Sequence, residues 1–309
     1  MLNVFLALAA IATAGASLHY FLPTLDIDAM RRQCGALVLN ILLPALNIEV
    51  IYHSPAGREL WQVPLAMLVG IVICVGVALL VMRRFNLDPR LKSSLLLACA
   101  FGNVTYLGMP LLRGLFPAHL IEVTELAILC EITVTSSDLI AGSLLAMYYH
   151  EGPGTHLTEA LAQVLKFPLI WSTAFAAVVR GLSIPLPDFL LMALHLLGQS
   201  TSGLMLLVLG MALKPSVIAQ TPRHIKSWWP AVCIKLGISP IVVAVIASTI
   251  GLTALNFRAT VLEAAMPPQM FTFIVADRFG FDTEVLATAV AFMTVISLVT
   301  VPIIHRMLG

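Results

Sequence analysis

The chain has 309 residues, of which 60% are hydrophobic and 11% are charged, whereas roughly 25% charged residues are typical of a soluble domain. This balance excludes a cytosolic globular enzyme. The net charge of +1 provides no basic surface that could hold a nucleic acid backbone.

Apolar stretches bounded by charged residues follow one another along the chain. Because ionisable side chains are costly in hydrocarbon and a span needs about 20 residues, each stretch predicts a transmembrane helix. No Lys or Arg precedes the first stretch and its apolar run continues to Leu25, which favours a true span over a signal peptide. The ten predicted spans are residues 2–22, 31–51, 61–82, 93–116, 121–149, 164–184, 188–213, 227–252, 257–278 and 283–305.

Lys and Arg are distributed unevenly over the connections between these spans. Most of them fall on one set of alternating connections, which predicts that this side faces the cytoplasm. With an even number of spans, both termini are then expected outside a cell (inner) membrane. No connection is long enough to separate an independent soluble domain.

The longest connection, around residues 150–158, divides the chain into a first repeat of five helices, residues 1–150, and a second, residues 151–309. Five is odd, so the second repeat enters the membrane from the opposite side, as in an inverted repeat. The fourth helix of each repeat carries Pro near mid-membrane, at Pro110 and at Pro267-Pro268. Backbone groups freed by such breaks are tolerated only inside protein or beside a watery cavity. We therefore expect an all-α membrane protein whose broken helices 4 and 9 cross at a substrate site.

At these segments the chain resembles the auxin efflux carrier family. The resemblance rests on motifs that extend over the whole chain: Leu42-Leu43-Pro44-Ala45-Leu46, Gly102-Asn103-Val104-Thr105-Tyr106-Leu107-Gly108-Met109-Pro110-Leu111, Lys235-Leu236 with Pro240, Ala265-Met266-Pro267-Pro268, Phe273-Ile274-Val275-Ala276 and Ser297-Leu298-Val299-Thr300-Val301-Pro302. Pro268-Gln269 departs from the polar-then-glycine pair of the plant auxin carriers, which makes auxin itself a doubtful substrate.

The resemblance implies a fold shared with bile acid and sodium-proton transporters. Helices 1, 2, 6 and 7 would form a scaffold, usually in a homodimer, and helices 3–5 and 8–10 would form a moving transport domain. The implied activity is elevator-type transport of a small organic anion, carboxylate or auxin-like, across the bilayer.

Candidate substrate-binding residues lie in and beside the two breaks. Discontinuous helices expose backbone amides and the positive ends of their dipoles, which favours an anion. Asn103 is expected to contact a substrate carboxylate and Gln269 to face it; the alternative for Asn103 is an interhelical hydrogen bond. Gln199 and Ser200 lie at the middle of the seventh helix, where close helix packing is the alternative. The candidates are Asn103, Thr105, Tyr106, Pro110, Pro267, Pro268, Gln269, Gln199 and Ser200.

The fifth helix carries most of the intramembrane polarity. Glu131, Thr135 and Asp138 are spaced four and three apart and share one helical face, which predicts a proton relay or a cation site. The alternative is that Asp138 is neutral or paired with Lys235. Lys235 could also balance another carboxylate or extend to the cytoplasmic interface. The candidates for coupling to protons or sodium are Asp138, Glu131, Glu263 and Lys235, with Glu263 one turn before Pro267.

No catalytic or metal-binding motif stands out in the sequence, and the five cysteines show no close pair. We therefore expect no enzymatic activity, metal or cofactor, and interpret the chain as a secondary carrier. A sodium-coupled organic anion symporter of bile acid type, a ligand-binding membrane receptor and a channel remain the alternatives.

Overall fold

The fold was analysed in a computed structural model of the 309-residue chain. The structure describes residues 2–22, 24–53, 59–85, 87–149, 162, 165–212, 228–269, 271–272, 275–276 and 279–309. Within these residues every extended regular element is a helix. Six helical stretches of the described chain are long and apolar enough to cross a membrane: Ile27–His53, Trp61–Met82, Pro117–Ala146, Asp188–Met211, Trp228–Thr249 and Val285–Met307. The apolar helix Leu6–Phe21 is shorter, and the count of ten spans stays a prediction.

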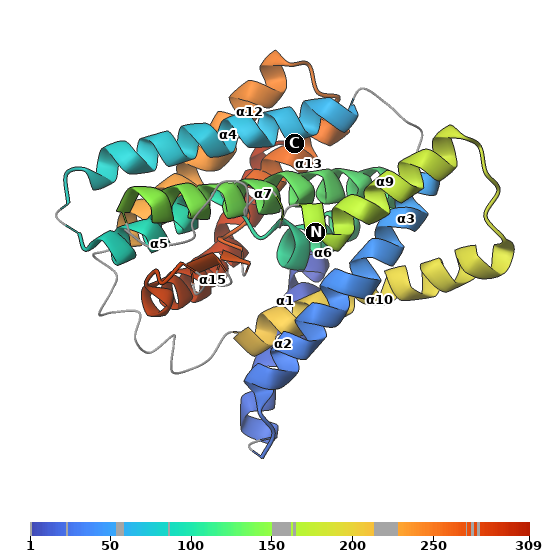
Figure 1. The fold of residues 1–309 in the computed structure, drawn as a ribbon, viewed down its shortest axis with the longest axis horizontal. Helices are drawn as coiled ribbons and strands as arrows, with labels where there is room; N and C mark the ends of the chain where they lie inside the picture. Colours follow the sequence, from blue (N-terminus) through green and yellow to red (C-terminus); the bar gives the residue numbers. More distant parts are fainter. Residues whose placement is uncertain are drawn as a thin grey trace. The chain divides into compact units, whose positions relative to one another are not determined.

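The chain divides into two compact units, which are described separately. Figure 1 labels the helices of the chain. Unit 1 comprises Met1–Gly57, Thr105–Ile128 and Leu165–Lys214, and unit 2 comprises Arg58–Val104, Leu129–Val164 and Pro215–Gly309. The division passes through helix α7 (Leu120–Tyr149) between Ile128 and Leu129.

Unit 1 contains helices from both halves of the sequence. They are α1 (Leu2–Phe21), α2 (Ile27–Leu37), the π-helical turn η1 (Val38–Leu42), α3 (Leu43–His53), α6 (Met109–Leu115), the 3-10 turn η3 (Pro117–His119), α9 (Pro168–Gly181) and α10 (Asp188–Ala212). Helix α10 packs against α1, α2 and α3, and α3 also packs against α9. The buried Asn47 amide joins α3 to α9 by donating to the hydroxyls of Ser172 and Thr173, each at 2.7 Å.

Two glycines allow α1 and α10 to approach closely. A Cβ on Gly210 would overlap the carbonyl of Ala12, and a Cβ on Gly15 would overlap the carbonyl of Leu207. Small residues at helix interfaces in membranes permit this backbone contact, which gains van der Waals packing. The pairing of Gly15 with Gly210 therefore fixes the distance between the first helix of the chain and α10.

We expect Gly210→Ala to destabilise the protein by about 1–3 kcal/mol, the usual cost of overpacking, because the backbone of α1 must move away. Gly203→Ala is the matched control, since the same substitution on α10 meets no atom within 4 Å. Thermal unfolding in detergent measures both variants. Equal unfolding temperatures for the two variants would show that the close approach of α1 and α10 does not contribute to stability.

Unit 2 contains α4 (Glu59–Met82), α5 (Pro89–Ala100), the π-helical turn η4 (Cys233–Ile238), α12 (Ser239–Thr249), α13 (Ala254–Ala264), α15 (Thr283–Met307) and the part of α7 from Leu129 onward. The π-helical turn η2 (Val104–Gly108) begins at the last residue of this segment of unit 2 and continues into unit 1. Helix α12 packs against α4 and α13, and α5 packs against α4 and α15. Residues 93–100 of α5 are all buried, so this helix lies inside the unit.

Candidate functional site

Two chain segments of unit 2 meet where helices end. Helix α5 ends at Ala100, Phe101 is extended, and α13 ends at Ala264. Gly102 and Pro268 form an antiparallel bridge. The backbone amide of Asn103 donates to the Pro267 carbonyl at 2.7 Å, and the backbone amide of Gln269 donates to the Phe101 carbonyl at 2.9 Å. The two segments, called the crossover below (residues 101–104 and 265–269), are therefore held together by their own backbones.

The paired prolines explain why the carbonyls of Glu263 and Ala264 lack their usual helical donors. In a continued α-helix, the carbonyls of Glu263 and Ala264 would accept from residues 267 and 268, but proline has no amide hydrogen. The Glu263 carbonyl accepts instead from the Met266 amide at 3.2 Å. The Ala264 carbonyl accepts from the Lys235 ammonium at 2.9 Å and from the Ser239 hydroxyl at 3.0 Å. Side chains of η4 and α12 thus replace the donors that the prolines remove.

Gly102 allows its neighbours to approach closely at the crossover. A Cβ at this position would lie 3.0 Å from the Lys235 Nζ and 3.3 Å from the Glu263 carbonyl oxygen. The absence of a side chain therefore lets the ammonium group reach the crossing backbones.

Several predicted site residues gather around the crossover in unit 2. Asn103 is 1% exposed, and Pro267, Pro268 and Gln269 are buried. The Gln269 side-chain amide donates to Asp138 Oδ2 at 2.8 Å, so the position expected to face Asn103 is engaged with α7. The crossover therefore brings together two predicted substrate amides and a predicted coupling carboxyl.

The three polar residues predicted to share one face of the fifth helix lie on α7. Glu131, Thr135 and Asp138 are all buried, and the Thr135 hydroxyl donates to Glu131 Oε1 at 2.6 Å. Glu263 is completely buried on α13, and neither of its carboxylate oxygens has a hydrogen-bond partner in the described part of the chain. It interacts electrostatically with Glu131 and with Lys235. Carboxyl groups from α7 and α13 thus converge beside the crossover.

Lys235 is 1% exposed, so the interpretation that its ammonium extends to the cytoplasmic interface is wrong. The alternative ion pair with Asp138 is not formed either: among the described residues the Lys235 ammonium bonds to Ala264 and, at 3.4 Å, to Ser239. Ser239 was not predicted from the sequence, although its position four residues after Lys235 places both on one helical face.

The remaining predicted substrate residues belong to unit 1. Thr105 and Pro110 are buried, and Tyr106 is half-buried with its hydroxyl close to Gly35 of α2. Gln199 and Ser200 are exposed on α10. The structure therefore places five of the predicted residues in a different compact unit from the side chain of Asn103.

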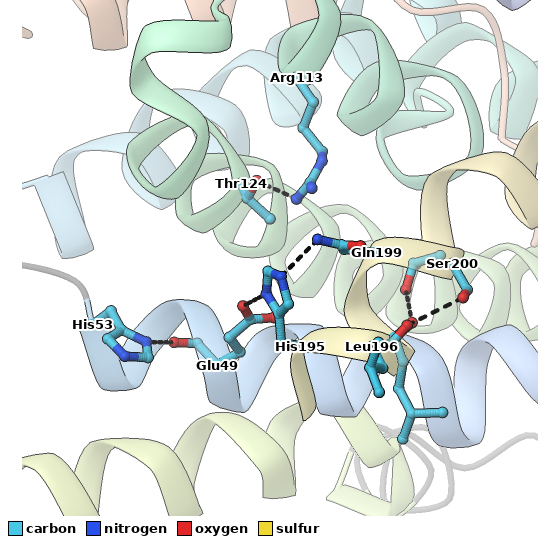
Figure 2. A network of polar contacts seen from close by, with 10 residues as sticks. Glu49, His53, Arg113, Thr124, His195, Leu196, Gln199 and Ser200 are labelled. Atoms are coloured by element: carbon cyan, nitrogen blue, oxygen red, sulfur yellow. Dashed lines mark hydrogen bonds and ion pairs between the residues drawn. The ribbon is translucent and has the colours of Figure 1, made fainter. Parts of the chain in front are cut away.

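Gln199 belongs to a second polar network, which lies in unit 1 (Figure 2). Its amide lies 2.6 Å from His195 Nε2, while His195 Nδ1 lies 2.6 Å from Glu49 Oε1. Figure 2 shows the Arg113 side chain extending from α6 toward this group, with its guanidinium donating to Thr124 at 3.0 Å. Ser200 donates to the Leu196 carbonyl one turn earlier, at 3.1 Å, which is a helix-internal contact.

Comparison with known proteins gives the family. The model of a family described as membrane transport protein matches residues 28–149 and 155–305. The chain is 25% identical over 269 residues to an uncharacterized transporter of Methanothermobacter thermautotrophicus, covering 86% of this chain and 85% of that protein. It is 21% identical over 275 residues to an uncharacterized transporter of Methanocaldococcus jannaschii, covering 86% and 85%. It is also 26% identical over 153 residues to auxin efflux carrier component 1 of Arabidopsis thaliana, covering 48% of this chain and 24% of the plant protein. The chain therefore belongs to the membrane transport protein family, that of the auxin efflux carriers, and is a multi-pass membrane transporter.

Proposed function

We propose that this protein is a secondary carrier that moves a small organic anion across the cell membrane by alternating access around the crossover. The observation that carries the proposal is the pair of backbone hydrogen bonds that joins residues 101–103 to residues 267–269. Non-helical backbone at membrane depth is tolerated where it is buried in protein or lines a polar cavity, and carriers bind their substrates at such interruptions. Asn103 is the first candidate for contact with the substrate.

The hydrogen-bond donors at the crossover support an anionic substrate. The ammonium of Lys235 lies beside Gly102 and is held by the Ala264 carbonyl. The side-chain amides of Asn103 and Gln269 add hydrogen-bond donors of the kind that bind a carboxylate. A carboxylate is therefore the substrate class that we infer, and auxin-like acids are included in it.

The grouping of helices supports an elevator mechanism on a ten-helix inverted repeat. The expected scaffold helices 1, 2, 6 and 7 correspond to α1, α2–α3, α9 and α10, all assigned to unit 1. Unit 2 contains α4, α5, α12, α13 and α15, which belong to the expected transport domain, while α6 and residues 120–128 of α7, also expected there, fall in unit 1. In this proposal α5–α6 and α13 with the chain that follows it form the fourth and ninth spans, and the scaffold mediates a homodimer in the inner membrane with both termini outside.

A second candidate function is sodium-coupled symport of an organic anion. The observation in its favour is the buried Glu263 carboxylate, whose oxygens have no hydrogen-bond donor in the described chain. A buried charge requires a proton, a cation or an opposite charge nearby.

The proposed function is tested by flux into proteoliposomes that contain the purified protein. Labelled mono- and dicarboxylates are supplied with and without sodium, at matched membrane potential. Saturable flux of a carboxylate supports the carrier, and a strict requirement for sodium favours the symporter. Binding without flux would support a receptor instead, and currents too large for a cycling carrier would support a channel.

Asp138→Asn is expected to change the pH dependence of this flux. Asparagine keeps an oxygen that accepts from Gln269 but cannot exchange a proton, so the variant removes titration while the hydrogen bond remains. The measurement is the initial rate as a function of pH, with Ser143→Ala as a control on the same helix. Wild-type pH and sodium profiles in Asp138→Asn would remove this residue from coupling.

A further inference from the structure

The ammonium of Lys235 is bound by oxygen atoms of neighbouring groups. The Ala264 carbonyl accepts from it at 2.9 Å and the Ser239 hydroxyl lies at 3.4 Å. The Glu263 carboxylate interacts with it electrostatically. Carbonyl, hydroxyl and carboxylate oxygens are the ligands that hard cations such as alkali and alkaline-earth ions prefer. The Ala264 carbonyl and the Ser239 hydroxyl would therefore suit a small free cation if the lysine side chain were absent, whereas the Glu263 carboxylate forms no ion pair with the ammonium within the described chain.

The oxygen contacts of Lys235 offset the cost of burying its charge. A charged amine inside a membrane protein is costly unless its donors are used and its charge is balanced. In the described residues Lys235 forms no ion pair at contact distance, and its ammonium donates to the Ala264 carbonyl and to the Ser239 hydroxyl. Gly102 leaves the space through which the ammonium reaches the crossover. The burial cost of Lys235 is thus offset at the point where Pro268 has left the Ala264 carbonyl without its amide donor.

We propose that Lys235 is the resident cation of the crossover: a positioning residue whose ammonium holds the Ala264 carbonyl and the Ser239 hydroxyl, so that this position requires no free metal cation. This inference rests on the proposed function, because it assigns to Lys235 a role in the substrate site of the carrier. It adds a specific consequence, which is that wild-type flux is independent of sodium, potassium and lithium, whereas a variant without the ammonium needs a substitute.

The test is chemical rescue of Lys235→Ala in proteoliposomes. The variant is expected to lose flux by about tenfold or more, since it removes the charged donor of the buried Ala264 carbonyl and leaves it only the Ser239 hydroxyl. Propylammonium, which carries three N–H donors, is expected to restore part of the flux, and tetramethylammonium, which has the charge but no donor, is expected to restore none. Lys166→Ala is the matched control, because Lys166 is exposed in unit 1.

The outcomes separate this proposal from the proposed function. Undiminished flux in Lys235→Ala, or a loss that neither propylammonium nor an alkali cation reverses, would overturn the resident-cation proposal while the carrier assignment stands. A strict sodium requirement in the wild type would overturn it as well.

If the wild type transports no carboxylate, thermal unfolding tests the role of Lys235 instead. Lys235→Ala should then unfold at a lower temperature and be stabilised by propylammonium but not by tetramethylammonium. The absence of that selective stabilisation would overturn the role of Lys235 independently of transport.

Discussion

Asn103→Ala is expected to abolish carboxylate flux while the protein still inserts and folds. The Asn103 backbone is fixed by its hydrogen bond to the Pro267 carbonyl, so the side chain projects from a fixed point of the crossover. Alanine keeps this backbone hydrogen bond and removes only the side-chain amide. Because the amide is expected to bind the substrate in every state of the cycle, its loss should reduce kcat/KM to the background rate of protein-free vesicles.

The control for this prediction is Asn40→Ala in η1, where the amide is exposed and donates to the Ala36 carbonyl. Both variants are compared by flux, by yield of monodisperse protein and by unfolding temperature. Wild-type kinetics in a folded Asn103→Ala protein would exclude the side chain from the substrate site. Loss of flux together with unfolding would assign it the interhelical packing role instead.

Helix ends could be predicted where a local signal marks them. The predicted span 188–213 agrees with α10, and the span 283–305 agrees closely with α15, whose first turn is capped by Asp282. The second helix begins four residues earlier than expected, at Ile27, because the Asp26 carboxylate accepts from the Ala29 amide. The prediction placed this charged segment outside the span on hydropathy alone, which does not register capping.

Long-range contacts at the crossover could be predicted only in part. Pro110 and the paired prolines identified the two helices that are interrupted, but the first segment crosses at residues 101–104, and Pro110 lies in the first turn of α6. The partner of the Ala264 carbonyl could not be predicted, because Lys235 lies 29 residues away and several acceptors were equally consistent with its sequence position. The contact of Gln269 with Asp138, 131 residues apart, was missed for the same reason.

The network in unit 1 shows a similar limit. Glu49 and His195 are 146 residues apart, and each occurs alone within an apolar stretch, so neither periodicity nor spacing connects them. Only the packing of α3 against α10 brings the carboxylate to the imidazole. Gln199 was selected for its polarity at the middle of α10, and the structure gives it His195 as a partner one turn away.

Replacing Pro267 and Pro268 together with alanine is expected to abolish flux by lengthening α13. The substitution supplies two backbone amides, which the carbonyls of Glu263 and Ala264 can then accept as in a regular helix. A helical conformation at residues 267 and 268 is incompatible with the bridge to Gly102 and with the hydrogen bond from Asn103 to Pro267. Helix α13 would therefore gain hydrogen bonds, and the crossover would lose the bonds that join its two segments.

The control changes two prolines that lie within helices, Pro64 of α4 and Pro302 of α15, to alanine. This double variant makes the same chemical change without touching the crossover and is expected to retain flux. Hydrogen exchange of peptides that contain residues 101–104 provides a second measurement, since the Asn103 amide should exchange faster once its acceptor is lost. If the crossover variant transports normally and keeps its Asn103 amide protected, the two segments do not depend on the prolines for their crossing. The prediction that Pro267 and Pro268 are needed for substrate binding would then be wrong.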